Sequence, residues 1–558
     1  MKKIYCLTFS ILLLASAGSS AQDLAAMVAK LQETVVPVEA SSKSYTPKIT
    51  FIQPAVVRYS YDEVDQKGNR TNYAYEFNLS DIDPYAVREQ TQKDIIQVVM
   101  AVRNKQKLVK FYKNEVVQAY DEQAAIVAKD IENARAISDI VKKAIAPAEK
   151  VMAGRLKISG YDAMVGWLST NVKNVDLGTR SFKQSLAKAD KVGSMRFTQV
   201  EADQKSSTEE VYTFNLADVN VNSIAYKITG NKFAISFETL QKARYISLRK
   251  NGEVKPYVNE ITINTNSVDE ARDLKTVLAL AAPLAVEKVK ADMGTVSSDK
   301  DALQRIKTLT AEVSVGNKQI AQELDPQCVC TFTQVEKDPK TTEKNVFKFS
   351  WVDINAVASK IDVAGDRMYV DLAVNDNKKL VMHTRDEKFN GYDNEVKLYV
   401  PDVERARRLK FAIDKAVEKC TASFKEPFGA DANPWIRANV KNVSLDEITV
   451  NQALEPVEAG NNNKLKYTRK EINSKGSGAE EVYEFNLSDL NPLSVEVEIK
   501  GKWLYVTAET EFKGKIIKYY KDGKIQPYAS TIQFAINDVE IGRSMVSALR
   551  KSIKALKK

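Results

Sequence analysis

The stretch Tyr75-Glu-Phe-Asn-Leu-Ser-Asp81-Ile-Asp83 decides the fold, because it occurs four times in the chain. It returns at residues 212–220, 347–355 and 483–491 as Tyr-Thr-Phe-Asn-Leu-Ala-Asp-Val-Asn, Phe-Lys-Phe-Ser-Trp-Val-Asp-Ile-Asn and Tyr-Glu-Phe-Asn-Leu-Ser-Asp-Leu-Asn. The recurring aspartates Asp81, Asp218, Asp353 and Asp489 are 137, 135 and 136 residues apart. This self-similarity predicts four tandem copies of one unit.

Two further series of residues keep the same spacing. They are the arginines Arg135, Arg272, Arg407 and Arg543 and the tyrosines Tyr120, Tyr257, Tyr392 and Tyr528. Each copy is long enough to bury its own core, so we expect separate domains on a string instead of a continuous superhelix. Pro147 and Pro283 are expected to stop or kink helices near the ends of copies. The predicted boundaries are a signal segment at 1–21 and copies at 22–150, 151–296, 297–428 and 429–558.

Within each copy, stretches of alternating apolar and polar residues predict antiparallel strands. In copy 4 the expected strands are Leu465–Ile472, Glu481–Leu487, Ser494–Lys500, Trp503–Thr510, Lys515–Tyr520 and Tyr528–Ile536. Asp522-Gly523 predicts a hairpin between the last two, and Asn251-Gly252 matches it in copy 2. Asn114-Glu115 and Asp386-Glu387 occupy the same place in the other two copies.

A helix is predicted to close each copy. It begins at a residue able to cap free backbone N–H groups, which is Asp130, Ser267, Asp402 or Asp538. The predicted fold class is α+β: four tandem copies of an antiparallel sheet or roll of about six strands, closed by a C-terminal helix. This order of elements resembles the pleckstrin-homology-like roll, and lipocalin-like and cystatin-like arrangements remain alternatives. The resemblance covers about 100 residues of each copy and implies no functional residue.

Composition and the first residues narrow the class of protein. The chain has 558 residues, with 82 Lys and Arg, 73 Asp and Glu and one His, giving a formal charge of +9. This charge is too dilute to predict nucleic-acid binding. Lys2 and Lys3, the apolar stretch from Ile4 to Ala17 and small residues before Gln22 predict an export signal cleaved after Ala21. The longest later apolar run, Val277 to Val286, is too short to span a bilayer, so no transmembrane segment is expected in the mature chain.

The recurring aspartates and arginines each allow two interpretations. Each aspartate is followed two positions later by Asp or Asn, which suits an Asx turn or, with further oxygen ligands, a calcium site. We expect the turn. Each arginine lies three residues after an acid on the predicted helix, so we expect an ion pair with that acid or with the turn aspartate of the same copy. The alternative is a repeated anion site.

The recurring tyrosines and the cysteines also allow structural and functional interpretations. Each tyrosine is expected to open the last strand with its ring buried, and an exposed stacking platform for a ligand is the alternative. Cys328, Cys330 and Cys420, with His383, all lie in copy 3, which allows a zinc site. We expect a disulfide, because an exported chain meets oxidising conditions. The sequence does not decide whether Cys328 or Cys330 pairs with Cys420.

We therefore expect a non-catalytic binding or scaffold protein of the bacterial cell envelope, periplasmic or on the cell surface. The predicted partner is a protein, a glycan or another envelope component, and no metal, cofactor or nucleic acid is expected. Repeated weak sites would gain avidity from their linkage. The alternative function is a carrier of lipid or another apolar ligand held between the sheet and its helix.

Overall fold

The computed structural model describes residues 21–230, 232–310, 312–315, 318–365 and 367–557. The expected export signal lies outside these residues, apart from Ala21. The chain divides into two compact units, Met1–Asp292 and Met293–Lys558. Unit 1 holds copies 1 and 2, and unit 2 holds copies 3 and 4. Copies therefore associate in pairs, whereas the sequence analysis predicted four separate domains on a string.

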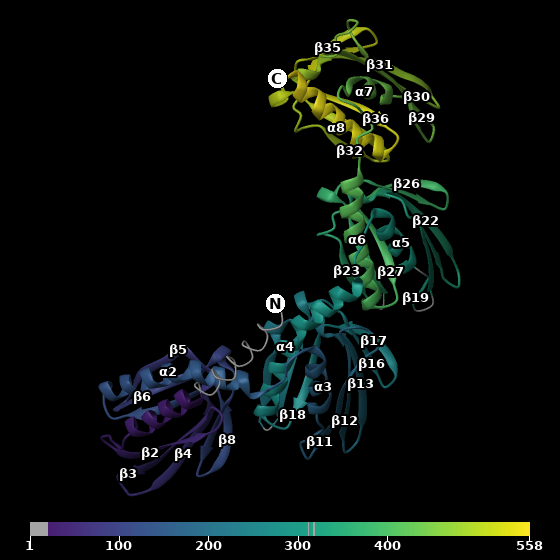
Figure 1. The fold of residues 1–558 in the computed structure, drawn as a ribbon. Helices are drawn as coiled ribbons and strands as arrows, with labels where there is room; N and C mark the ends of the chain where they lie inside the picture. Colours follow the sequence, from purple (N-terminus) through teal and green to yellow (C-terminus); the bar gives the residue numbers. More distant parts are fainter. Residues whose placement is uncertain (1–20, 231, 311, 316–317, 366, 558) are drawn as a thin grey trace, which may run out of the picture. The chain divides into compact units, whose positions relative to one another are not determined.

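Every copy has the same order of elements: a helix, nine strands interrupted by short 3-10 turns, and a closing helix (Figure 1). Copy 1 consists of a helix over residues 21–34, β1 (Val38–Glu39), β2 (Lys43–Ile52), β3 (Val56–Asp65), β4 (Arg70–Asn78), η1 (Leu79–Asp81), β5 (Ile82–Gln92), β6 (Ile95–Val102), η2 (Arg103–Lys105), β7 (Val109–Lys113), β8 (Val116–Asp121), β9 (Gln123–Ala128) and α2 (Ile131–Arg155). Copy 2 consists of α3 (Tyr161–Asn171), β10 (Val175–Asp176), β11 (Arg180–Lys188), β12 (Ser194–Asp203), β13 (Ser207–Asn215), η3 (Leu216–Asp218), η4 (Val221–Ser223), β14 (Ala225–Thr229), β15 (Lys232–Glu238), η5 (Leu240–Lys242), β16 (Ile246–Lys250), β17 (Glu253–Val258), β18 (Glu260–Thr265) and α4 (Val268–Met293).

Unit 2 repeats this order. Copy 3 consists of α5 (Asp299–Leu309), β19 (Val313–Val315), β20 (Lys318–Leu324), β21 (Val329–Lys337), β22 (Thr342–Ser350), η6 (Trp351–Asp353), β23 (Lys360–Ala364), β24 (Arg367–Ala373), η7 (Asn375–Asn377), β25 (Val381–Arg385), β26 (Lys388–Asp393), β27 (Glu395–Val400) and α6 (Val403–Ser423). Copy 4 consists of α7 (Asn433–Asn439), β28 (Val443–Leu445), β29 (Ile448–Pro456), β30 (Lys464–Asn473), β31 (Gly476–Asn486), η8 (Leu487–Asp489), β32 (Glu496–Lys500), β33 (Trp503–Glu509), η9 (Glu511–Lys513), β34 (Ile517–Lys521), β35 (Lys524–Ala529), β36 (Thr531–Ile536) and α8 (Val539–Leu556).

The strands of each copy form two antiparallel sheets, one of six strands and one of three. In copy 4 the large sheet has the order β28-β29-β30-β31-β34-β35 and the small sheet the order β32-β33-β36. The chain leaves the large sheet at η8, which ends at Asp489, and so the recurring stretch marks the crossover between the sheets. The predicted α+β fold of four tandem copies is confirmed. The opening helix and the additional strands depart from the pleckstrin-homology-like order.

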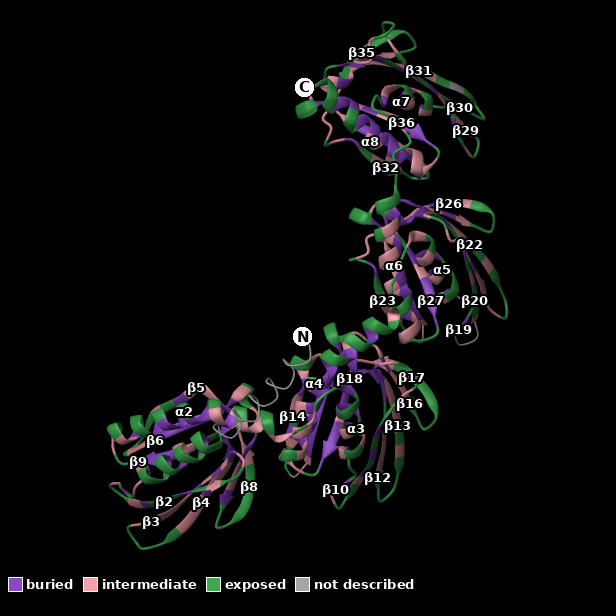
Figure 2. Ribbon diagram, viewed as in Figure 1, coloured by how far each residue is buried: buried purple, intermediate pink, exposed green. Residues whose placement is uncertain are grey.

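The two helices of a copy cover different sheets. The opening helices α3, α5 and α7 contact β11, β20 and β29 of the large sheets, whereas the closing helices α2, α6 and α8 contact the small sheets. In copy 1 one apolar cluster joins Leu24 of the opening helix, Tyr59 and Phe77 of the large sheet, Val98 of the small sheet and Ile137 of α2. Figure 2 shows the buried residues on the inner faces of sheets and helices, with exposed residues at the hairpin tips.

Hairpin turns and helix caps follow the sequence prediction. Asp522 and Gly523 both have positive φ, as the tight turn between β34 and β35 requires, and the corresponding pairs in the other copies do too. The Asp522 carboxylate also accepts a hydrogen bond from the backbone N–H of Glu480 at 2.9 Å. Asp130, Ser267, Asp402 and Asp538 cap the closing helices.

Two details of the helices differ from expectation. Pro147 and Pro283 lie inside α2 and α4, which continue to Arg155 and Met293. Residue 150, an expected boundary, therefore lies within a helix.

Candidate functional site

An arginine on the closing helix of the second copy in each unit contacts the first copy. In unit 1 the Arg272 guanidinium donates to Asp81 at 2.5 Å and also pairs with Asp269. In unit 2 the Arg543 Nε and Nη2 atoms donate to the two carboxylate oxygens of Asp353 at 2.8 and 2.7 Å. Arg543 also donates to Glu540. The fork geometry of arginine suits this two-point contact with a carboxylate.

These ion pairs are largely shielded from water. The exposed side-chain fractions are 9% for Arg272 and 12% for Asp81, and 18% for Arg543 and 9% for Asp353. Burial alone would lower the arginine pKa values, but the negative charge of the neighbouring carboxylates and the hydrogen bonds that they accept raise the pKa of both Arg272 and Arg543 above its ordinary value. Both arginines therefore stay charged and hold two carboxylates each.

The partner aspartate of Arg543 differs from the expected one. The predicted ion pair between Arg543 and the acid on its own helix, Glu540, is present. The alternative partner was predicted to be the turn aspartate of the same copy. Asp489, the turn aspartate of copy 4, instead accepts a hydrogen bond from Asn486 Nδ2 at 2.9 Å, and Arg543 contacts Asp353 of copy 3. In unit 1 the aspartate that Arg272 contacts is likewise that of the preceding copy. The recurring residues thus join copies.

The Asx turns that the sequence suggested are formed by neighbours of the recurring aspartates. Asp83, Asn355 and Asn491 each accept a hydrogen bond from the backbone N–H two residues later, at 2.9 to 3.1 Å. The corresponding Asn220 does the same in copy 2. The structure places no group of three or more His, Cys, Asp or Glu side chains within reach of one metal ion among the residues it describes.

A second ion pair links the copies of unit 2. Lys348 Nζ on β22 lies 2.8 Å from Asp538 Oδ2, the capping residue of α8. Burial would raise the pKa of Asp538, but the hydrogen bond from Lys348 and the backbone N–H of Glu540 lower it below its ordinary value.

The recurring tyrosines end the sixth strand of each large sheet, so the expectation that they open the last strand is wrong. Tyr528 belongs to β35, and the chain then enters the small sheet at Thr531. In unit 1 the Tyr120 ring meets Phe233 of copy 2 edge-on, with ring centroids 5.1 Å apart. In unit 2 burial, with a contribution from Asp538, raises the pKa of Tyr392 to about 12. Tyr257 is half-buried, whereas Tyr528 is exposed.

The cysteines and the histidine of copy 3 have separate structural environments. Cys328, just before β21, forms a disulfide with Cys420 of α6. Cys330 is a free, buried thiol, and burial raises its pKa. The His383 ring stacks on Phe347 with centroids 4.5 Å apart, and its Nε2 atom lies 2.8 Å from Asn345 Oδ1. These contacts do not assemble a zinc site.

His383 is one rung of an aromatic ladder across the large sheet. Phe332, Phe347 and His383 are cross-strand partners on β21, β22 and β25. Tyr467, Tyr483 and Tyr519 are the corresponding ladder in copy 4, where the second and third rings stack 4.8 Å apart. Cross-strand aromatic pairs stabilise sheets, so the one histidine has a structural environment.

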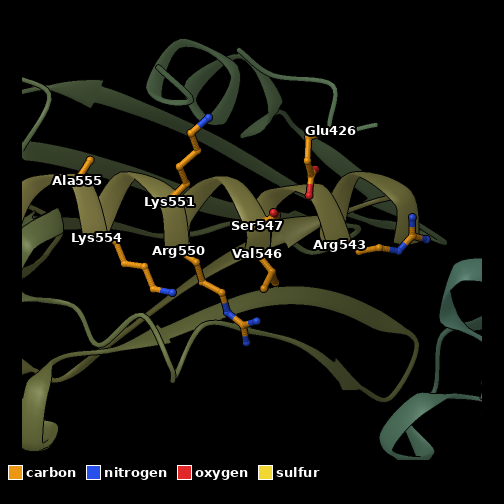
Figure 3. A pocket seen from close by; sticks show the side chains of 8 residues that line it. All are labelled: Glu426, Arg543, Val546, Ser547, Arg550, Lys551, Lys554 and Ala555. Atoms are coloured by element: carbon orange, nitrogen blue, oxygen red, sulfur yellow. The ribbon is translucent and has the colours of Figure 1, made fainter. Parts of the chain in front are cut away.

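A hollow lies on the closing helix of the second copy in each unit. The hollow of unit 2 has a volume of about 720 Å³ and is lined by Glu426 and by residues of α8, namely Arg543, Val546, Ser547, Arg550, Lys551, Lys554 and Ala555 (Figure 3). The hollow of unit 1 has a volume of about 440 Å³, and α4 contributes Arg272, Asp273, Lys275, Thr276, Ala279 and Leu280 to it.

The two hollows share part of the closing helix but differ in the rest of their lining. The unit 1 hollow is also lined by residues of copy 1, such as Asp81, Arg103 and Glu149, whereas Glu426 is the one lining residue of the unit 2 hollow outside α8. When Arg272 is aligned with Arg543, five helix positions line both hollows. At two of them Ala279 and Leu280 are replaced by Arg550 and Lys551. The unit 1 hollow balances Asp81, Glu149 and Asp273 against Arg103, Arg272 and Lys275, whereas the unit 2 hollow has four cations and one acid.

Sequence reasoning missed both the contact between copies and these hollows. The signal for the hollows was present in the aligned closing helices. The positions of Arg550 and Lys551 hold Ala279 and Leu280 in copy 2, whereas copy 1 also has cations there, Lys142 and Lys143. Nothing in a single copy indicates that its aspartate contacts the arginine of the next copy.

Comparison with known protein families and with curated proteins found no match for this chain. Among the residues that the structure describes, no helix combines the length and the apolar character needed to cross a membrane.

Proposed function

We propose that the protein is a non-catalytic, exported binding or scaffold protein of the bacterial cell envelope. In each unit we assign binding to the hollow that is built on the closing helix of the second copy beside the Asp–Arg pair. The observation that carries this proposal is that the two hollows have different linings. One repeated scaffold thus offers two chemically different surfaces to its partners, and linkage of the units adds avidity.

Filled cores favour binding at these surfaces over the carrier function. Tyr467 of the large sheet meets Phe534 of the small sheet edge-on, with centroids 4.9 Å apart. In copy 1 the Tyr59 hydroxyl, on the large sheet, accepts a hydrogen bond from the backbone N–H of Val127 on the small sheet at 3.1 Å. A carrier would need open space between these layers, where large side chains are fully buried.

The environments of the most reactive side chains support a non-catalytic role. His383 belongs to an aromatic ladder, Cys328 and Cys420 form a disulfide, and Cys330 is buried. A nucleophile and a base must converge in an accessible cleft for covalent catalysis. The disulfide also suits an oxidising compartment, in agreement with the proposed export.

The experiment is a binding assay of the full mature chain, exported into a bacterial periplasm, against purified cell-wall glycan and purified envelope proteins. Variants R103E and K551E change one hollow each, and measurements of the melting temperature Tm check their folding. Binding that either variant weakens without a loss of Tm supports the proposal. An apolar ligand of lipid mass, released on denaturation in native mass spectrometry, would instead support the carrier.

A further inference from the structure

The outer face of α8 carries two rows of side chains with a hollow between them. Arg550 and Lys554 point to one side of the helix, and Lys551 points to the other, where Ala555 also lies (Figure 3). Positions four apart on a helix are about 5–6 Å apart at their Cβ atoms, so Arg550 and Lys554 are neighbours. Ser547 and Ala555 are the small neighbours of Lys551 in its own row. Three cations therefore line the hollow, two in one row and one in the other.

These cations have neutral partners. Arg550 Nη2 donates to the backbone carbonyl of Val495 at 2.8 Å, and Lys551 Nζ donates to that of Gly429 at 2.8 Å. In the described part of the chain, no carboxylate pairs with either residue or with Lys554. Arg543, at one end of the hollow, is already neutralised by Asp353 and Glu540. Glu426 is the one acid in the lining, so the hollow keeps a net positive charge.

The hollow of unit 1 shows that this charge is not required by the fold. At the equivalent place Ala279 and Leu280 replace two of the cations, and the charges balance. The helix dipole favours lysines near a helix C-terminus. That effect would explain a single exposed lysine, but not cations on both sides of one hollow.

We propose that the α8 hollow binds a ligand that carries two or more phosphate groups about one helical turn apart. Arg550 would contact one phosphate through its planar fork of donors, and Lys554, on the same side of the helix, would supply a point charge to the next. Lys551 adds positive charge from the other side of the helix. This inference deepens the proposed binding function and rests on it. The phosphate groups could belong to a soluble oligophosphate or to an envelope lipid, which present the same chemistry to the hollow.

The test is isothermal titration of the full mature chain with sodium tripolyphosphate and, separately, with orthophosphate at low ionic strength. We expect tripolyphosphate to bind more tightly. The double variant R550A/K554A should weaken binding about tenfold or more, because it removes two charge-assisted hydrogen bonds. The control K521A/K524A removes the same charge from exposed positions of copy 4 outside the hollow and should leave the affinity unchanged.

A second variant protects the test against misfolding. Ala555 is exposed, so A555W fills the hollow while it keeps every charge, and it should also weaken tripolyphosphate binding. Absence of binding by the unaltered protein, or equal losses in R550A/K554A and K521A/K524A, would overturn the inference.

Vesicles distinguish the two sources of phosphate. Binding to vesicles that contain phosphatidylglycerol, lost in R550A/K554A and competed by tripolyphosphate, would assign the hollow to a lipid headgroup. Tripolyphosphate binding without vesicle binding would assign it to a soluble ligand. If tripolyphosphate fails to bind but R103E still weakens glycan or protein binding, the phosphate inference fails while the proposed function stands.

Discussion

Arg543 contacts two carboxylates that come from different copies, and so its loss affects more than one domain. Glu540 belongs to its own helix and Asp353 to the copy before. Removal of Arg543 leaves the shielded carboxylate of Asp353 without its partner, and removal of Asp353 leaves Arg543 paired with Glu540 alone. The Asp–Arg pair is therefore the residue-level link that holds two copies in one unit.

We expect Asp353→Ala and Arg543→Ala each to lower the free energy of unfolding of unit 2 by about 2–3 kcal/mol, the cost of losing charge-assisted hydrogen bonds. The double variant should cost clearly less than the sum of the two, as urea denaturation can measure. Asp489→Ala is the matched control, because Asp489 only accepts from Asn486 and should cost about 1 kcal/mol or less. Equal costs for Asp353→Ala and Asp489→Ala would contradict the pairing between copies.

The cysteines of copy 3 lead to a second prediction at this scale. Cys420→Ser should lower the stability of unit 2 by about 2–4 kcal/mol, because the disulfide closes a long loop. In the unaltered protein, iodoacetamide should label Cys330 only after denaturation, as mass spectrometry would show. Rapid labelling of the native protein would place Cys330 at the surface.

At the scale of elements, the cap of α8 couples a helix to the neighbouring copy. The pKa of Asp538 is lower in the folded protein than in the unfolded chain. The unfolded state therefore binds more protons in this pH range, and the stabilisation is lost as pH falls through the folded pKa, below about pH 4.

We expect unit 2 to lose stability as the pH falls from about 5 to about 2, and the variant Lys348→Met to lose less over this interval because it lacks the cross-copy hydrogen bond. Urea midpoints at the two pH values measure the difference. Lys344→Met, on the same strand but exposed, is the control and should keep the full pH dependence. Identical pH profiles for Lys348→Met and the unaltered protein would rule out this coupling.

Elements with local signals were predictable from the sequence. The Asp522-Gly523 turn, the capping residues and the strands around Tyr483 follow from backbone preferences and alternation. The strands β28 and β29 were missed, because their lead-in was taken as irregular. The stretch Tyr528–Ile536 was expected as one strand, whereas β35 and β36 belong to different sheets. Alternation alone does not indicate which sheet a strand joins.

The candidate site was harder to predict than the fold, for a physical reason. Asp81 and Arg272 are 191 residues apart, and their contact depends on how copies pack. The repeat spacing identified both residues as recurring positions, but it did not indicate which residues they contact. The charge of the α8 hollow was visible only when closing helices were compared position by position.

At the scale of the whole molecule, the two compact units predict how the chain unfolds. Calorimetry of the full mature chain should show two transitions, one for each unit, because copies within a unit share ion pairs and apolar contacts. Arg543→Ala should lower the Tm of the unit 2 transition and leave that of unit 1 unchanged. Four separate transitions would instead mean that each copy unfolds independently of its neighbour.

The closing helices combine a fixed inner face with a variable outer face. Leu278 of α4 and Leu549 of α8 are both fully buried at the same position, while Leu280 and Lys551 face outward. Substitutions on the outer face can therefore change the surface of a closing helix without changing how its buried face packs. For protein engineering, this makes each closing helix a place where a recognition surface can be transplanted from one unit to the other on an unchanged framework.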